Sequence, residues 1–360
     1  MTEKIFDIPW DRFQMLTPSD KVPYLMQDNG SPYHTLFVQQ FSAELLDDLA
    51  RLANKIRAIA KTRAGTEFLK TQISHKRAML YFSQPSSRTF LSFMSACQIL
   101  GVSTGEVRDT SISSEFKGES REDSVRTFSS YFDLIIMRTP EKGLAEHMAW
   151  VLSSSERSIP IINAGSGQDQ HPTQALLDIY TLLRSFERNG GLHDKTVVFC
   201  GDLLRGRTVR SLSYLLTNYA NIRQIFVAPA QLQVGDDVIA ALKRKNTAFE
   251  ITSDFHAALP KADAVYMTRI QDEWDKDKGE SDHIDTSRFK FGMRELGLLP
   301  SRGIIMHPLP RRDEISTEID IDPRAMYWRQ MRNGMWIRAA LIAVTFGCEK
   351  RIHEYFRHNY

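Results

Sequence analysis

Several side chains that can bind a small anion come directly after short apolar segments of this chain. Ser86, Ser87, Arg88 and Thr89 follow the apolar run at 78–83 and open a helical pattern. The first turn of a helix offers unpaired backbone N–H groups and the positive end of the helix dipole, and the hydroxyls and the guanidinium add further donors. The segment therefore suits a phosphate group, although a serine that simply caps the helix would give the same pattern.

Arg138, His171 and Gln174 occupy comparable positions further along the chain. Arg138 ends the apolar run at 133–138, and a buried arginine is costly unless it meets an anion or another acceptor. His171 precedes a helical pattern, where the helix dipole favours the neutral imidazole. A neutral histidine can donate a hydrogen bond that polarises a carbonyl oxygen, and Gln174 can contact the same ligand one turn later. A salt bridge between domains at Arg138 and a capping role for His171 remain alternatives.

Two further arginines follow apolar runs in the second half of the chain. Arg207 stands at the start of a helical pattern, in a segment that begins like a dinucleotide-binding loop but lacks the second and third glycines in register. Arg269 follows the apolar run at 264–268, and Glu273 lies four residues beyond it. A local ion pair between Arg269 and Glu273 could account for this arginine without any ligand.

Taken jointly, these positions predict one polyanionic small ligand. Arg88, Arg138, Arg207 and Arg269 all lie at the carboxyl ends of predicted strands, where open α/β sheets bind their ligands. The net charge of the chain is only +2, so an anion must be attracted by a local cluster of cations. The sequence shows no paired-carboxylate set, no Ser/His/Asp order and no metal-binding cluster. The predicted chemistry therefore rests on positioning and charge stabilisation.

The elements that must position these side chains alternate along the chain. Apolar runs predict strands at 78–83, 133–138, 159–163, 197–200, 224–228, 264–268 and 304–306, and a further strand is expected at 105–108. Periodic patterns predict helices at 41–60, 89–100, 172–186 and 334–347. This alternation predicts an α/β fold of two domains, each a parallel sheet flanked by helices. Residues 1–33 show little periodicity, and we expect an irregular arm that packs on the surface or on another subunit.

Composition excludes several other classes of protein. A chain of 360 residues is too long for one ordinary core, and 42 % hydrophobic with 25 % charged residues is typical of a globular protein. The nearly balanced charge predicts no nucleic-acid or membrane partner, and the longest apolar run near the end, at 339–347, is too short to span a bilayer. The 3 widely spaced cysteines form no disulfide framework or zinc motif, and the N-terminus lacks the layout of a signal peptide. We therefore expect a cytoplasmic protein.

In combination, these segments resemble the aspartate carbamoyltransferases. The likeness runs in order from about His34 to Gly347. The matching motifs are SSRT (86–89), KGES (117–120), MRTP (137–140), INAGSGQDQHPTQALLD (162–178), GDLLRGRTV (201–209), YMTRIQDE (266–273) and MHPLPRRDEI (306–315). The resemblance implies transfer of the carbamoyl group of carbamoyl phosphate to the amino group of L-aspartate. The products are N-carbamoyl-L-aspartate and phosphate, in de novo pyrimidine biosynthesis.

The resemblance also implies a division of labour between two domains. It implies an N-terminal arm at 1–33, a carbamoyl phosphate domain at 34–172 that the C-terminal helix at 334–360 completes, and an aspartate domain at 173–333. In the first domain, Ser86, Ser87, Arg88 and Thr89 would hold the phosphate, Thr89, Arg138 and His171 the carbamoyl oxygen, and Gln174 the carbamoyl amide. In the second, Arg207, Arg269 and Gln271 would bind the aspartate carboxylates, and the backbone carbonyls of Pro308 and Leu309 would accept amide and amine hydrogens.

The family implies a homotrimer with shared active sites and no metal or organic cofactor. Ser113 and Lys117 would reach the neighbouring subunit's site, Ser113 beside carbamoyl phosphate and Lys117 beside aspartate. Regulatory or dihydroorotase partners are left open by the sequence.

The chain departs from the family pattern at a few positions. Ser87 stands where Thr is usual, Gln84 where Glu is common, Phe90 where an Arg normally follows, and Trp274 where some members carry an Arg. The last three bear on domain closure rather than on the chemistry.

Two other functions were weighed against carbamoylation of aspartate. An ornithine carbamoyltransferase would need a site for a second amine, and Pro308 replaces the Cys that is typical of that branch. A pseudoenzyme that serves as an assembly partner would have lost substrate-contacting residues, and none of those positions is emptied.

Overall fold

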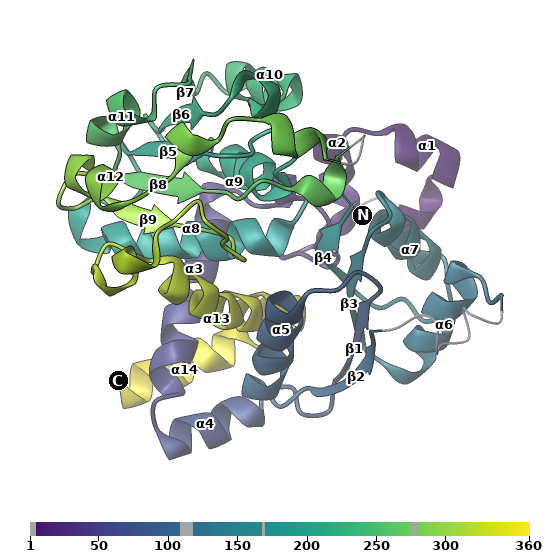
Figure 1. Ribbon diagram of the computed structural model, residues 1–360. Helices are drawn as coiled ribbons and strands as arrows, with labels where there is room; N and C mark the ends of the chain where they lie inside the picture. The colour runs from purple at the N-terminus through teal and green to yellow at the C-terminus, as the bar shows by residue number, and fades with distance from the viewer. Residues whose placement is uncertain (1–4, 109–117, 168–169, 276–278) are drawn as a thin grey trace. The chain divides into compact units, whose positions relative to one another are not determined.

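The computed structural model describes residues 5–108, 118–167, 170–275 and 279–360. The chain forms two compact units, Met1–Leu176 with Gly334–Tyr360, and Leu177–Asn333. Each unit contains one parallel sheet with helices packed on it (Figure 1), so the predicted fold class is confirmed. The chain leaves the first unit within α8 (Pro172–Phe186) and returns to it within α13 (Tyr327–Thr345).

The sheet of the first unit has the strand order β2-β1-β3-β4. Its strands are β1 (Arg77–Phe82), β2 (Ser103–Val107), β3 (Leu134–Thr139) and β4 (Ile161–Ser166), and all neighbouring pairs are parallel. In β3 and β4 every residue is buried, which explains why these strands read as continuous apolar runs rather than as alternating patterns. The register sets Phe82 at the end of β1 beside Arg138 near the end of β3.

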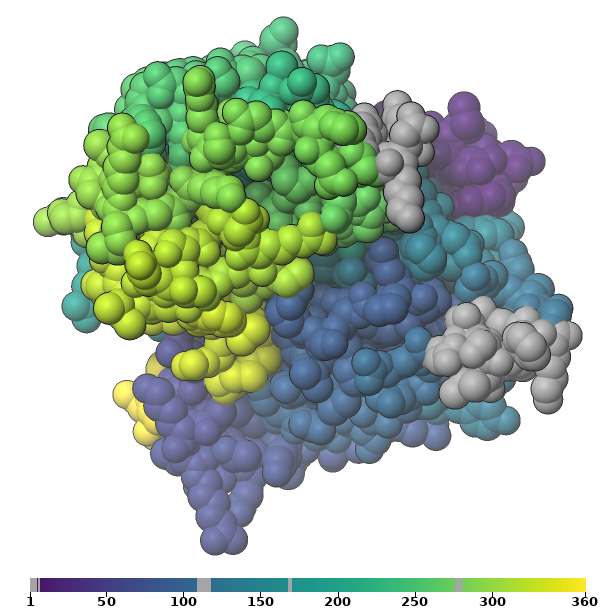
Figure 2. Space-filling view, in the orientation of Figure 1, coloured from purple at the N-terminus to yellow at the C-terminus, as the bar shows by residue number. Residues whose placement is uncertain are grey.

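The helices predicted at 41–60 and 89–100 are present in the first unit, whereas those at 63–70, 121–131 and 144–153 were not predicted. The helices of this unit are α3 (Ala43–Ile59), α4 (Arg63–Lys70), α5 (Ser87–Ile99), α6 (Arg121–Tyr131), α7 (Leu144–Ser153) and α14 (Glu349–Asn359). Ser42 caps α3, because its hydroxyl accepts from the backbone N–H of Leu45 at 3.3 Å. The C-terminal helix expected at 334–360 is interrupted at 346–348, and its last part is the separate helix α14. This helix lies along α3 and α4 (Figures 1 and 2), where the ring of Tyr355 stacks on Phe68 at 3.8 Å.

The N-terminal segment differs from the expected irregular arm. It contains two short helices, α1 (Trp10–Met15) and α2 (Pro18–Leu25), so the expectation of irregular structure is wrong. The side chain of Phe13 is fully buried in the core that also contains β1, β3 and α7. Lys21, only 4 % exposed, forms an ion pair with Glu146 on α7. The arm is therefore part of the core of its own unit.

The second unit is built on a sheet with the order β7-β6-β5-β8-β9. Its strands are β5 (Thr196–Cys200), β6 (Arg223–Val227), β7 (Ala248–Thr252), β8 (Ala264–Met267) and β9 (Ile304–Met306), all in parallel register. β7 was not predicted. It is an edge strand with no fully buried residue and a glutamate at its centre, so it lacks the apolar run that marks the other strands.

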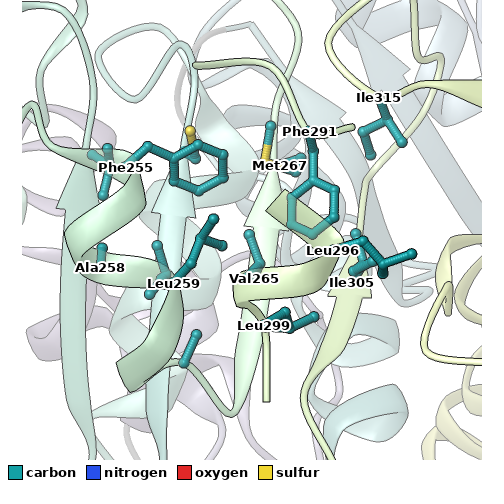
Figure 3. Packing of buried hydrophobic residues seen from close by; sticks show 14 of the residues in the cluster. Phe255, Ala258, Leu259, Val265, Met267, Phe291, Leu296, Leu299, Ile305 and Ile315 are labelled. Carbon is teal, nitrogen blue, oxygen red and sulfur yellow. The ribbon is translucent and has the colours of Figure 1, made fainter. Parts of the chain in front are cut away.

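The two faces of this sheet carry separate cores because successive side chains of a strand point to opposite faces. On one face, Val198 and Val265 pack with Phe255, Phe291 and neighbouring aliphatic residues (Figure 3). On the other face, the ring of Phe199 stacks on Phe226 with the centroids 5.3 Å apart. The remaining helices are α9 (Arg207–Leu216), α10 (Asp236–Arg244), α11 (Phe255–Ala258) and α12 (Met293–Leu298). Among the described residues, no helix has the length and apolar character needed to cross a membrane.

Candidate active site

The predicted phosphate-binding residues lie at the start of α5, directly after β1. Ser86 is the N-terminal flanking residue of α5, and its hydroxyl donates to the hydroxyl of Thr89 at 3.0 Å instead of accepting from a backbone N–H of the helix. Thr89 is buried, whereas Ser87 and Arg88 are exposed. The geometry therefore does not show the simple serine cap, and the first turn of such a helix has backbone N–H groups that can bind an anion.

Arg138 lies at the carboxyl end of β3, next to β1 in the sheet. The pairing of β3 with β4 shifts register between Met137 and Thr139, and such irregularities re-aim side chains near functional sites. The Arg138 side chain is buried and donates from Nη1 to the carbonyl oxygen of Ala164 at 3.2 Å. Its own carbonyl accepts from the backbone N–H of Gln84 at 3.4 Å. The ends of β1, β3 and β4 are therefore joined around this arginine.

His171 and Gln174 meet the same end of the sheet from the start of α8. The carbonyl of His171 accepts from the N–H of Gln174 at 3.0 Å and from the N–H of Ala175 at 3.2 Å. His171 is 4 % exposed, and its Nε2 lies 3.5 Å from Nη1 of Arg138. The structure thus places Arg138 beside His171, with Gln174 one turn further along α8, and puts Thr89 in the first turn of the helix that follows β1. Ser113 and Lys117 lie outside the described residues.

In the second unit, the predicted aspartate-binding side chains follow β5, β8 and β9, which are neighbours in the sheet. Arg207 is the first residue of α9, and Arg269 and Gln271 come directly after β8. The β5 and β8 ends approach closely at Gly201, where a Cβ atom would lie 2.1 Å from the carbonyl oxygen of Thr268. Only glycine fits there, and its φ of +119° is likewise a glycine conformation.

Arg207 and Arg269 share a carboxylate neighbour, Glu273. Arg269 forms the predicted ion pair with Glu273 through both terminal nitrogens, with one contact at 2.8 Å. Burial lowers the pKa of Arg207 to about 10, and the charge of Glu273 acts in the opposite direction. Arg207 therefore remains cationic at neutral pH. Glu273 orients Arg269 and at the same time favours the charged form of Arg207.

A second ion pair ties the segment after β8 to the segment after β9. Asp272 accepts two hydrogen bonds of 2.8 Å from the guanidinium of Arg312, and this contact lowers the pKa of Asp272 to about 2. Both residues line a cavity of about 160 Å³ that Gly201 and Thr268 also border. The pair was not predicted, because its members are far apart in the sequence.

The backbone of Pro308 and Leu309 is held by a buried histidine. The N–H of Leu309 donates to Nδ1 of His307 at 2.7 Å, so the ring proton must be on Nε2, which lies 2.7 Å from Oε1 of Glu314. Burial lowers the pKa of His307, in keeping with a neutral ring. Burial by itself would raise the pKa of Glu314, but the hydrogen bond from His307 brings it below its ordinary value. The histidine therefore fixes the turn that presents the Pro308 and Leu309 carbonyls.

This turn is tied further into the core by residues that the sequence analysis missed. The N–H of His307 donates to the side-chain oxygen of Gln330 at 2.9 Å, and the amide of Gln330 donates to Asp178 at 2.7 Å. Asp178 is fully buried and also accepts from the hydroxyl of Tyr266 at 2.8 Å. A buried aspartate within the INAGSGQDQHPTQALLD motif was the one available signal for this network.

The positions that depart from the family pattern are satisfied within their own units. Phe90 is 3 % exposed and packs edge-on against Phe82, and the guanidinium of Arg108 lies 4.5 Å above the Phe90 ring. The backbone N–H of Trp274 donates to the carbonyl of Gln271 at 3.0 Å. Within the described residues, no three His, Cys, Asp or Glu side chains are grouped to hold a metal ion.

The fold and these clusters define a two-domain α/β protein that gathers cationic and hydroxyl groups at the carboxyl ends of both sheets. Comparison with known families gives a more specific answer. Residues 33–184 match the carbamoyl phosphate-binding domain of aspartate/ornithine carbamoyltransferases, and residues 193–345 match the Asp/Orn-binding domain. The chain belongs to the aspartate/ornithine carbamoyltransferase family.

Within this family, the reported relatives are aspartate carbamoyltransferases. The chain is 40 % identical over 310 residues to the chloroplastic aspartate carbamoyltransferase of Arabidopsis thaliana, covering 84 % of this chain and 75 % of the relative. It is 38 % identical over 313 residues to the aspartate carbamoyltransferase catalytic subunit of Vibrio cholerae, covering 87 % of this chain and 96 % of the relative.

Solved structures agree with these relatives. The aspartate transcarbamoylase of Trypanosoma cruzi in complex with carbamoyl phosphate aligns with a TM-score of 0.78 at 33 % identity, covering 89 % of this chain and 98 % of that one. The catalytic subunit of the M. jannaschii enzyme aligns with a TM-score of 0.76 at 34 % identity, with the same coverage.

Proposed function

We propose that this chain transfers the carbamoyl group of carbamoyl phosphate to the amino group of L-aspartate and releases phosphate. The observation that carries the proposal is the cluster of Thr89, Arg138 and His171 at the ends of β1, β3 and β4. There a buried guanidinium lies 3.5 Å from a buried imidazole. A guanidinium donates hydrogen bonds, and a neutral imidazole donates from one ring nitrogen, so the two groups can serve an oxygen that gains negative charge during acyl transfer.

The proposed roles in the first unit follow from the chemistry of each group. Ser86, Ser87, Arg88 and the first turn of α5 bind the phosphate of carbamoyl phosphate. Thr89, Arg138 and His171 donate to the carbamoyl oxygen, and Gln174 accepts from or donates to the carbamoyl amide. As the aspartate amine attacks the carbamoyl carbon, charge grows on the carbamoyl oxygen and these donors stabilise it. The departing phosphate accepts the amine proton, so the mechanism needs no protein base.

The proposed roles in the second unit explain the choice of amine substrate. Arg207, Arg269 and Gln271 bind the two carboxylates of aspartate, and the carbonyls of Pro308 and Leu309 accept hydrogens from the amide and the amine. Ornithine carries a second amine in place of the second carboxylate, and it would place a cation beside Arg269. The match of the family model includes ornithine enzymes, so the preference for aspartate rests on this charge argument and on the names of the relatives.

Assembly and location belong to the same proposal. We propose a homotrimer in which Ser113 and Lys117 complete the neighbouring subunit's site. Cys97, Cys200 and Cys348 are buried free thiols, which supports a reducing compartment such as the cytoplasm. The product places the reaction in pyrimidine biosynthesis.

The test is a carbamoylation assay on the purified chain with carbamoyl phosphate and either aspartate or ornithine. We expect carbamoylaspartate to form and ornithine to remain unreacted. The Vibrio cholerae relative, run in parallel, serves as the positive control. Faster turnover of ornithine than of aspartate, or no product from either amine, would refute the proposal.

A further inference from the structure

Arg205, in the GDLLRGRTV motif, has no role in the chemistry proposed above. Its side chain is only 11 % exposed and its Nη1 contacts an acidic side chain at close range, that of Asp275, at 2.8 Å. The same nitrogen donates to the hydroxyl of Ser281 at 2.8 Å and approaches the carbonyl oxygen of Gln271 at 3.5 Å. One guanidinium therefore joins the segment after β5 to three points of the segment after β8.

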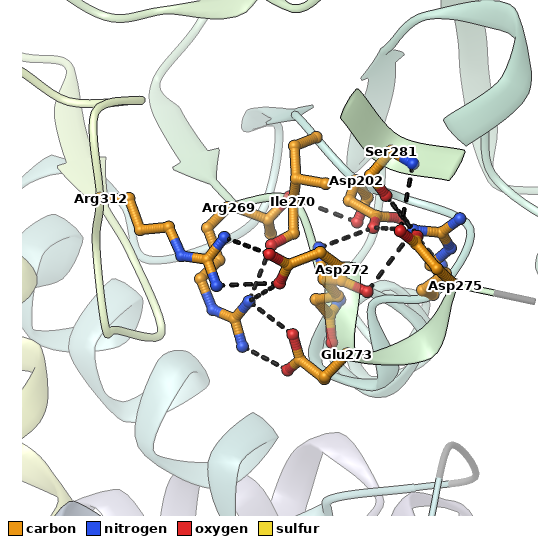
Figure 4. A network of polar contacts seen from close by, with 11 residues as sticks. Asp202, Arg269, Ile270, Asp272, Glu273, Asp275, Ser281 and Arg312 are labelled. Carbon is orange, nitrogen blue, oxygen red and sulfur yellow. Dashed lines mark hydrogen bonds and ion pairs between the residues drawn. The ribbon is translucent and has the colours of Figure 1, made fainter. Parts of the chain in front are cut away.

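A buried carboxylate supports this junction from the other side. Asp202 is fully buried and accepts from the backbone N–H of Arg205 and from the backbone N–H of Gln271, both at 3.1 Å. Burial raises the pKa of Asp202, and these two N–H groups act against that rise. Asp202, Ile270, Asp275 and Ser281 lie around the junction in Figure 4. Hydrogen bonds thus fix the Gln271 backbone at both its N–H and its carbonyl.

The junction lies between two groups that the proposed function assigns to aspartate. Arg205 is two residues before Arg207, the first residue of α9. Gln271 is the residue whose backbone the junction holds, and Arg269 is two residues before it. A guanidinium placed here sets the spacing between Arg207 and Gln271, because it restrains the two loops that carry them.

We propose that Arg205 is a positioning residue for the aspartate site, acting through Asp275, Ser281 and Gln271 rather than by touching substrate. This inference rests on the proposed carbamoylation of aspartate and deepens it. Arg205 is not among the residues predicted to bind aspartate. Its role is to hold Arg207 and Gln271 at the distance that a dicarboxylate requires. Carbamoyl phosphate, which the first unit binds, does not depend on this spacing.

The side chain must be an arginine for a geometric reason. A lysine carries a comparable charge but is a compact point donor, whereas the guanidinium is a planar fork that can serve several fixed acceptors at once. Arg205→Lys should therefore keep the ion pair with Asp275 and lose part of the restraint on Gln271. Arg205→Met should lose both, and Asp275→Asn should weaken the same junction from its acidic side.

The experiment compares these variants with a matched control in the same unit. Arg223 pairs with Glu250 at 2.6 Å on the edge of the sheet, between β6 and β7, so Arg223→Met also removes a paired arginine. Thermal unfolding first shows that each full-length variant is folded. Steady-state kinetics are then measured with aspartate varied at saturating carbamoyl phosphate, and again with carbamoyl phosphate varied at saturating aspartate. The wild-type chain is assayed first.

In Arg205→Met we expect the KM for aspartate to rise about tenfold. A rise of this size is at the lower end of the loss in affinity expected when one charge-assisted hydrogen bond is removed. The KM for carbamoyl phosphate should stay within twofold. Asp275→Asn should change in the same direction, Arg205→Lys should fall between Arg205→Met and the wild type, and Arg223→Met should match the wild type. A merely structural role would lower stability without separating the two KM values.

The inference is overturned if wild type carbamoylates aspartate and folded Arg205→Met keeps its aspartate KM, or if both KM values rise equally. Should Arg205→Met fail to fold, the same comparison between Arg205→Lys, Asp275→Asn and Arg223→Met decides the question. A wild-type chain that makes no carbamoylaspartate instead refutes the proposed function, and the inference falls with it.

Discussion

Replacing Arg138 by alanine should lower turnover far more than it weakens substrate binding. The side chain is buried at the end of β3, donates to the carbonyl of Ala164 at 3.2 Å and lies 3.5 Å from Nε2 of His171. If these two groups stabilise the charge that grows on the carbamoyl oxygen, removing one donor costs about 3 kcal/mol in the transition state. That corresponds to a fall in kcat of about a hundredfold.

The competing effect is structural, and its size is smaller. Losing the hydrogen bond to Ala164 costs about 1 kcal/mol of stability, with a further loss from the packing of the buried stem. Such a loss lowers the melting temperature but leaves the turnover of each folded molecule unchanged. The structural cost and the catalytic cost can therefore be separated by measuring kcat against the concentration of folded protein.

A matched control residue, Arg157, makes its contacts near the opposite end of β3. Arg157 donates to the carbonyl of Ser130 at 3.1 Å and to Asp133 at 3.3 Å. Asp133 directly precedes β3, at the end of the strand opposite to Arg138. Arg157→Ala should keep full kcat, and Arg138→Lys should recover part of the loss because it keeps the charge. The role of Arg138 is refuted if Arg138→Ala keeps the wild-type kcat and only raises a KM.

Three further predictions follow from the structure and the proposed assembly. Asp178→Ala leaves two buried donors without their acceptor and should lower the free energy of unfolding by about 2–6 kcal/mol. Asp178→Asn should cost about half as much, and equal urea midpoints for the two variants would contradict this. Gln84→Glu should tighten aspartate binding by at most about 1 kcal/mol in kinetics across aspartate concentrations, whereas a large loss of activity would give Gln84 a different role. Inactive Lys117→Ala and Arg138→Ala chains, mixed and reassembled, should regain activity at interfaces where both residues are intact; mixtures as inactive as either parent, despite proven subunit exchange, would count against shared sites.

The strands and the ends of the strands could be predicted because parallel strands buried on both faces leave apolar runs in the sequence. Arg138 was placed at the end of β3 on this basis alone, and the structure has β3 at Leu134–Thr139. β7 was not predicted, because an edge strand with Glu250 at its centre gives no such apolar run. The sequence signal for a strand is thus a signal of burial, and it fails where one edge of the strand is open.

The N-terminal helices α1 and α2 were not predicted, for a different reason. Helices as short as α1 and α2 are marginal on their own and depend on tertiary contacts. The local signals were present, since the side chain of Thr17 accepts from the N–H of Asp20 and Pro18 opens α2. What holds the segment is the burial of Phe13 and the ion pair of Lys21 with a residue 125 positions away, which no local pattern reveals.

The difference between local and long-range contacts also separates the ion pairs of the candidate site that were predicted from those that were not. The Arg269–Glu273 pair was predicted because its members are four residues apart. Arg205 with Asp275, and Arg312 with Asp272, join residues 70 and 40 positions apart. Arg205, Arg312 and Asp272 lie within the motifs quoted above, but nothing local in the sequence indicates that they pair with residues of another loop. A single sequence can therefore propose, by motif, which groups touch a substrate, but it does not reveal the ion pairs that hold the loops beneath them.

The departures from the family pattern fit this division between contact and support. Phe90, where the family usually has an arginine, is packed against Phe82 in the core of its own unit, and Trp274 closes a local turn on Gln271. Neither the phenylalanine nor the tryptophan side chain carries a charge. The ion pairs of Arg205 and Arg312 instead lie wholly within the second unit. These two ion pairs therefore order the loops that follow β5, β8 and β9 within that unit.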